Sequence, residues 1–107
     1  MNAVEEDVKT LMKKELDAAN ATFPLFRSPH EGYAVIKEEY EECLQELEHV
    51  NSCLKFAWGN IKLNNDKYAE EWISKARKCA MNTAVEAIQT AAMCQKYLRS
   101  AWHWETE

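Results

Sequence analysis

Apolar residues recur every three or four positions along most of this chain, which is the spacing of amphipathic helices. Residues 1–22 predict a first helix on this pattern. Its apolar positions are Val4, Val8, Leu11, Met12 and Leu16. Pro24 disfavours helix at the residue before it, so residues 23–28 are expected to form an apolar linker that packs on the core.

A second helix is predicted over residues 29–63. Ser28 can cap its start, Pro29 suits the first helical position, and Glu31 completes a Ser-x-x-Glu capping box. The apolar seam of this helix consists of Ile36, Tyr40, Cys43, Leu47, Val50 and Leu54. Gly59 could bend or end the helix, and residues 64–66 have the composition of a turn that caps the next helix.

A third helix is predicted over residues 66–100. Its first half is amphipathic, whereas residues 80–98 are apolar or small almost all round, which predicts a buried, alanine-rich helix. Residues 101–107 are expected to form a tail that carries Trp102 and Trp104. These two indole rings could close the core or form an oligomer contact, and the pattern does not choose between them.

The composition supports an all-α protein with a single domain. The chain has 107 residues, only two glycines and two prolines, and no alternating pattern typical of strands. Two or three helices of about 30 residues would be rods roughly 45 Å long. Because three such rods do not cover every apolar face, we expect long antiparallel helices, about three to four, that assemble into an oligomeric bundle, a homodimer or homotetramer.

Charge and cysteine usage exclude several classes of function. The net charge is −5 and no basic stripe is present, which argues against nucleic-acid binding. No apolar run is long enough to cross a membrane and no signal peptide is evident, so a cytoplasmic location is expected. The four cysteines form no Cys-x-x-Cys pair and lie near no histidine at zinc-site spacing, which favours buried reduced thiols.

The acidic run at residues 38–42 is the first sign of chemistry. Glu38, Glu42 and Glu46 follow one another four residues apart with no lysine between them. Like charges at this spacing cost a few tenths of a kcal/mol each on an isolated helix. The run is therefore either a solvated acidic face or one half of a cation site.

The third helix offers the other half. Its apolar part carries a polar stripe of Asn82, Glu86 and Gln89, bordered by Lys78 and Lys96. A buried carboxylate needs a cation, a hydrogen-bond network or an opening to solvent. The stripe is either an exposed edge of the helix or a surface that faces the acidic run. In the second case Mg²⁺ is the natural ion, with oxygen ligands, retained waters and substrate phosphates.

The pattern Glu38-Glu39-x-x-Glu42, followed on the next helix by Glu86, resembles the MazG-like all-α nucleoside-triphosphate pyrophosphohydrolases. Residues 28–39 and 86–93 are similar to short phage or prophage proteins near that superfamily. The resemblance implies that these four carboxylates bind Mg²⁺, with Mn²⁺ as a substitute. It also implies that Glu38 and Glu39 are catalytic, and that water attacks the α phosphorus to release pyrophosphate and a nucleoside monophosphate.

One position departs from the family pattern. Gln89 occupies the place of the family's aspartate, and its amide oxygen could still bind the metal but brings no charge and cannot act as a base. Lys78 and Lys96 could meet substrate phosphates as point charges, or could be ordinary surface lysines. The sequence thus predicts a Mg²⁺-dependent pyrophosphohydrolase-like protein. The alternative is a nucleotide-binding or helical interaction protein without catalysis.

Overall fold

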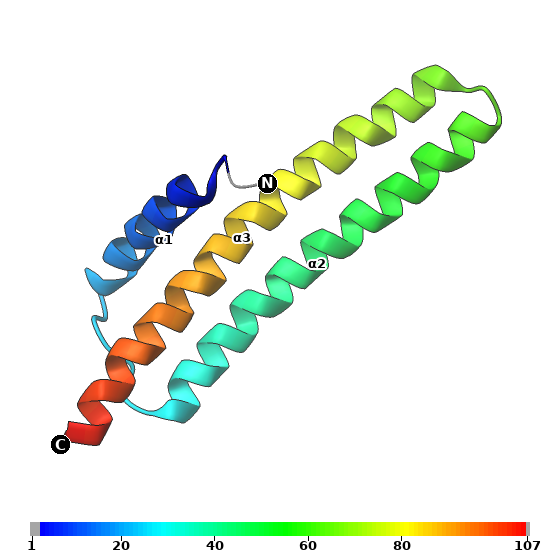
Figure 1. Ribbon diagram of the computed structural model, residues 1–107. Helices are drawn as coiled ribbons and strands as arrows, with labels where there is room; N and C mark the ends of the chain where they lie inside the picture. The colour runs from blue at the N-terminus through cyan, green and yellow to red at the C-terminus, as the bar shows by residue number, and fades with distance from the viewer. Residues whose placement is uncertain (1–2, 107) are drawn as a thin grey trace. The chain divides into compact units, whose positions relative to one another are not determined.

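A computed structural model describes residues 3–106 and confirms the all-α class, since these residues form three helices and no strand (Figure 1). Helix α1 spans Glu5–Asn20, α2 spans Pro29–Lys62 and α3 spans Asp66–Thr106. The first two helices lie within the ranges predicted from the sequence. Helix α3 is longer than predicted.

The Ser28 N-cap predicted at the start of α2 is present. The Ser28 hydroxyl oxygen accepts a hydrogen bond from the backbone N–H of Glu31 at 3.2 Å, as the sequence predicts. The Ser28 carbonyl accepts the N–H of Gly32 at 3.1 Å, which is the first bond of the helical ladder. This cap fixes the residue at which the linker ends and α2 begins.

The turn between α2 and α3 is centred on Asn64, which adopts a left-handed backbone conformation with φ of 60°. The N–H of Asn65 bonds the carbonyl of Asn60 at 2.9 Å, and the N–H of Asn64 bonds that of Ile61 at 3.1 Å. This bond pattern is a Schellman motif in which asparagine takes the place usually held by glycine. Helix α2 ends at Lys62, three residues after Gly59, so Gly59 does not end the helix.

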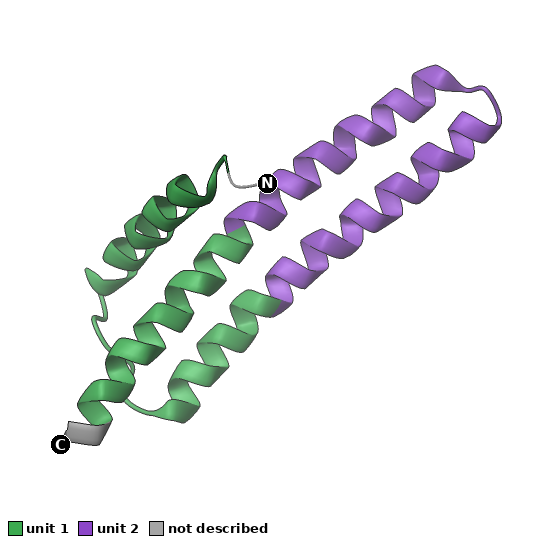
Figure 2. Ribbon diagram, viewed as in Figure 1, with its two compact units in different colours: residues 1–40, 86–107 green, residues 41–85 purple. Residues whose placement is uncertain are grey.

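The chain divides into two compact units (Figure 2). Unit 1 contains residues 3–40 and 86–106 of the described chain, so it is built from α1, the first part of α2 and the second part of α3. Unit 2 contains residues 41–85, which form a hairpin of the remaining parts of α2 and α3.

The core of unit 1 is organised around Ser100, which is fully buried. Its hydroxyl accepts a hydrogen bond from the backbone N–H of Phe26 at 2.8 Å and donates one to the carbonyl of Lys96 at 2.8 Å. Leu16 and Ala92 are also buried here, and Phe26 is the one residue of the 23–28 linker that is buried. The linker therefore packs on the core as expected, through a single side chain and a backbone hydrogen bond.

The predicted tail at residues 101–107 is wrong for the part that the structure describes, because α3 continues through it to Thr106. The continuation has a physical cause in Trp104. Its indole N–H donates to the carbonyl of Phe26 at 3.2 Å, and its ring meets that of Tyr97 edge to face at 5.3 Å. Trp104 thus closes the unit 1 core, while Trp102 is 62% exposed in the single chain.

The core of unit 2 is narrow. Its buried residues are all small: Cys53, Ala57, Ala69 and Ala76. Phe56 and Trp72 stack with ring centroids 4.7 Å apart, at a more exposed position of the hairpin. Small residues between the two helices let their backbones approach closely, but they bury little apolar area.

The expectation of a helix buried all round at residues 80–98 is wrong for the single chain. Met81, Val85 and Leu98 are 64%, 50% and 63% exposed, whereas Ala92 is fully buried. The reason is geometric, since neighbouring helices in each unit cover only part of the circumference of α3. None of the described helices combines the length and the apolar character that a bilayer span needs.

Candidate functional site

Two of the predicted site residues meet in unit 1. Glu39 on α2 and Glu86 on α3 are both half-buried, and they present carboxylate oxygens within 4.8 Å of each other. One oxygen of each carboxylate is inaccessible to solvent. Two acidic groups held this close from separate helices form an arrangement that a divalent cation between them would stabilise.

A cavity of about 380 Å³ in unit 1 is open to Glu39 and Gln89. Its walls come from all three helices and consist of Glu15, Ala18, Ala19, Glu39, Gln89, Ala92 and Met93. Three of these residues are alanines, so the space exists because small side chains stand where the helices meet. Gln89 of α3 and Glu39 of α2 therefore line the same cavity.

The other acidic residues of the motif are exposed. Glu38 immediately precedes Glu39 on α2 but does not line the cavity, and its side chain is exposed to solvent. Glu42 is exposed as well and belongs to the segment of α2 in unit 2. Because Glu42 follows Glu39 by three residues on a continuous helix, the two share one helix face.

The two lysines predicted to meet phosphates have different surroundings. Lys78 is exposed in unit 2. Lys96 is only 5% exposed in unit 1, and its ammonium nitrogen lies 4.7 Å from the centroid of the Phe26 ring. Burial lowers the pKa of Lys96 below its usual 10.5, and the nearby Glu31 carboxylate partly opposes the shift.

The buried lysine gives a stability prediction. Because its folded-state pKa is lowered, the native protein binds this proton more weakly than the unfolded chain does. Raising the pH from the lowered pKa to beyond 10.5 should therefore stabilise the wild type through this group. In Lys96→Met this titration is absent. We expect the stability of the variant relative to wild type to fall as pH rises through that window.

Urea unfolding from neutral to strongly alkaline pH measures this difference. Lys78→Met is the matched control, since it removes an exposed lysine and supplies the baseline for losing one positive charge. For each variant, the free energy of unfolding is compared with that of the wild type at every pH. If this difference changes with pH in the same way for Lys96→Met and Lys78→Met, burial does not perturb the pKa of Lys96.

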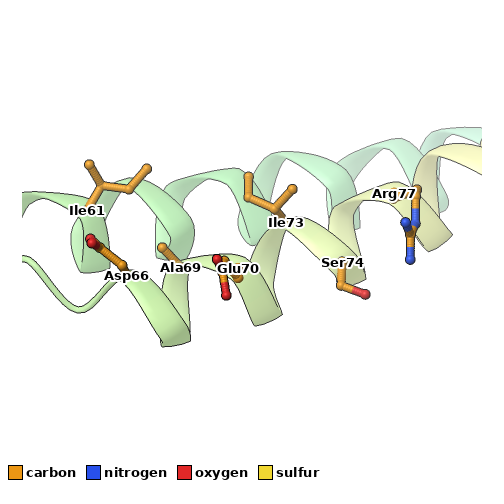
Figure 3. A pocket seen from close by; sticks show the side chains of 7 residues that line it. All are labelled: Ile61, Asp66, Ala69, Glu70, Ile73, Ser74 and Arg77. Carbon is orange, nitrogen blue, oxygen red and sulfur yellow. The ribbon is translucent and has the colours of Figure 1, made fainter.

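A separate hollow lies in unit 2 (Figure 3). Its volume is about 550 Å³, with Asp66 toward one end and Arg77 toward the other. The remaining lining residues are Ile61, Ala69, Glu70, Ile73 and Ser74. No residue of the predicted site lines this hollow, and its polar groups are spread along one helix rather than converging on a point.

Glu15 is the member of the unit 1 cavity that the sequence does not predict. It belongs to α1, which carries no part of the acidic motif. The available signal is weak: Glu15 is followed after three and four residues by Ala18 and Ala19, which mark a face where another helix can approach. Glu15 brings to the cavity a carboxylate in addition to the uncharged Gln89.

No protein-family model, curated protein or solved structure matches this chain.

Proposed function

We propose that the protein is a Mg²⁺-dependent nucleotide pyrophosphohydrolase that uses the unit 1 cavity. The observation that carries the proposal is the approach of the Glu39 and Glu86 carboxylates to within 4.8 Å from two different helices. Oxygen donors are the ligands that Mg²⁺ prefers, and the buried oxygens of this pair fit a small hard cation.

In this proposal Glu39, Glu86 and the amide oxygen of Gln89 would hold the ion. When bound, Mg²⁺ would neutralise phosphate charge and lower the pKa of a coordinated water. Glu39 would accept the proton of the attacking water, with the exposed Glu38 as the alternative base. The new bond joins the water oxygen to the α phosphorus, and the bond from that phosphorus to the bridging oxygen breaks, releasing pyrophosphate.

The free cysteines and the exposed apolar surface extend the proposal to the location and the oligomeric state of the protein. All four cysteines are free thiols, which fits action in the cytoplasm, where nucleotides are abundant. Leu63, Met81 and Val85 are at least half exposed in unit 2, and under this proposal a second copy of the chain would cover them. A homodimer or homotetramer is therefore part of the proposal.

The alternative function is nucleotide binding without hydrolysis. It is favoured by Gln89, because an amide in the cavity lowers the negative charge available to the ion and supplies no base. Under this alternative the site would retain a metal-bound nucleotide and release it unchanged.

Pyrophosphate release from a panel of nucleoside triphosphates, with Mg²⁺ or Mn²⁺, tests the enzyme. We expect metal-dependent release by the wild type and at least a roughly hundredfold loss in Glu39→Gln, since a charged ligand and base are removed. Glu48→Gln, an exposed glutamate of the same helix, is the matched control. Nucleotides that raise the melting temperature but stay intact would favour the alternative. If nucleotides are neither hydrolysed nor raise the melting temperature, both the enzyme and the nucleotide-binding function are contradicted.

A further inference from the structure

A second group of metal-ligating side chains lies within unit 2. Glu46 and His49 on α2 and Cys79 on α3 bring a carboxylate oxygen, an imidazole nitrogen and a sulfur within 4.8 Å of one another. The Glu46 Oε2 to His49 Nδ1 distance is 3.8 Å. Glu46 and Cys79 are half-buried and His49 is exposed, so the group lies at the surface of the hairpin with one side open to solvent.

Cys53 adds a fourth donor. It is buried, and its thiol lies beside the thiol of Cys79. On α2, Cys53 follows His49 by four residues and Glu46 by seven, so all three share one helix face. One face of α2 thus presents a carboxylate, an imidazole and a thiol toward the Cys79 thiol of α3.

We propose that Glu46, His49 and Cys79 bind a zinc ion in unit 2, with Cys53 as the fourth ligand. Two sulfurs, one imidazole and one carboxylate are borderline-soft donors that select Zn²⁺ over Mg²⁺ or Ca²⁺. Four protein ligands fill a tetrahedral shell, which is the arrangement of structural zinc sites rather than catalytic ones.

The ion would clamp α2 to α3. The hairpin needs such a clamp, because the buried residues of unit 2 are cysteine and alanine and contribute little apolar area. Metal binding that depends on ligands from both helices adds its free energy to the folding of the hairpin. The site is independent of the proposed nucleotide chemistry, since none of its ligands lines the unit 1 cavity.

Titration of the reduced full chain with Co²⁺, a spectroscopic substitute for Zn²⁺, tests the site. We expect one equivalent to give tetrahedral absorption bands and a thiolate-to-cobalt charge-transfer band, and Zn²⁺ to abolish both. Cys79→Ser and Cys53→Ser should each retain about half of the charge-transfer band, because the band scales with the number of bound thiolates. A full band in Cys53→Ser would remove Cys53 from the ligand set.

His49→Ala keeps the test decisive if a cysteine variant folds poorly. The His49 side chain is 55% exposed, so its removal leaves the packing of the hairpin intact. We expect this variant to bind Co²⁺ at least about tenfold more weakly. Cys94→Ser, which removes an exposed thiol of unit 1, should bind as the wild type does. Wild-type protein without a charge-transfer band, or Cys79→Ser binding unchanged, would overturn the proposal.

Discussion

Replacing Gly32 with alanine is expected to lower the free energy of unfolding by about 1–2 kcal/mol. A Cβ atom at this position would lie 2.6 Å from Cδ2 of Tyr97 and 3.1 Å from Cδ2 of Phe26. The Tyr97 ring cannot simply turn aside, because it also meets the ring of Trp104. Overpacking of this kind costs about 1–3 kcal/mol, and the better helix propensity of alanine offsets only part of it.

The same substitution at Gly59 should have the opposite sign. Nothing lies within 4 Å of a Cβ built at Gly59, which is also in the interior of α2. Gly59→Ala should therefore stabilise the protein by about 0.5–1 kcal/mol through backbone entropy alone. Urea denaturation of the two variants beside wild type measures both effects. Equal stability changes at the two glycines would mean that α2 does not approach Tyr97 closely.

Neutralising Glu86 is expected to remove the stabilisation that Mg²⁺ gives. If the ion binds only the folded protein, Mg²⁺ at a hundred times its dissociation constant stabilises the wild type by about 2.7 kcal/mol. Glu86→Gln keeps the shape of the side chain and removes the charge that faces Glu39 within 4.8 Å. We expect the variant to show little or no stabilisation at the same Mg²⁺ concentration.

Thermal unfolding with and without Mg²⁺ separates this effect from a general loss of stability. Without the ion, Glu86→Gln should be no less stable than the wild type, because one of two close carboxylates has been neutralised. Glu48→Gln removes an exposed charge from α2 and should keep the full Mg²⁺ response. A wild-type response to Mg²⁺ that survives in Glu86→Gln would place the ion elsewhere.

Local features of this chain could be predicted from its sequence because their causes are local. The start of α2 depends on Ser28 and Glu31, which are three residues apart, and both contribute to the cap. The turn at Asn64 depends on residues within one turn of the helix end. The hydrophobic period predicted that the helices exist, and the proline, cap and turn residues predicted where most of them begin or end.

Features that depend on how helices face each other could not be predicted. The tail at residues 101–106 continues α3 because Trp104 binds a carbonyl 78 residues away, which no local pattern reports. Glu15 joins the cavity, and Cys79 joins His49, only because of the rotation of one helix against another. The prediction that no cysteine lies near a histidine at zinc spacing considered separation along the chain alone, and unit 2 brings such a pair together.

The division of unit 1 into two chain segments has a kinetic consequence. The hydrogen bond from Phe26 to Ser100 closes a loop of 74 residues, whereas unit 2 is one hairpin joined by the turn at Asn64. Loop-closure entropy therefore favours assembly of the hairpin first, which then shortens the effective separation of the unit 1 segments. Changes in the turn should act mainly on the folding rate, and changes at Ser100 mainly on the unfolding rate.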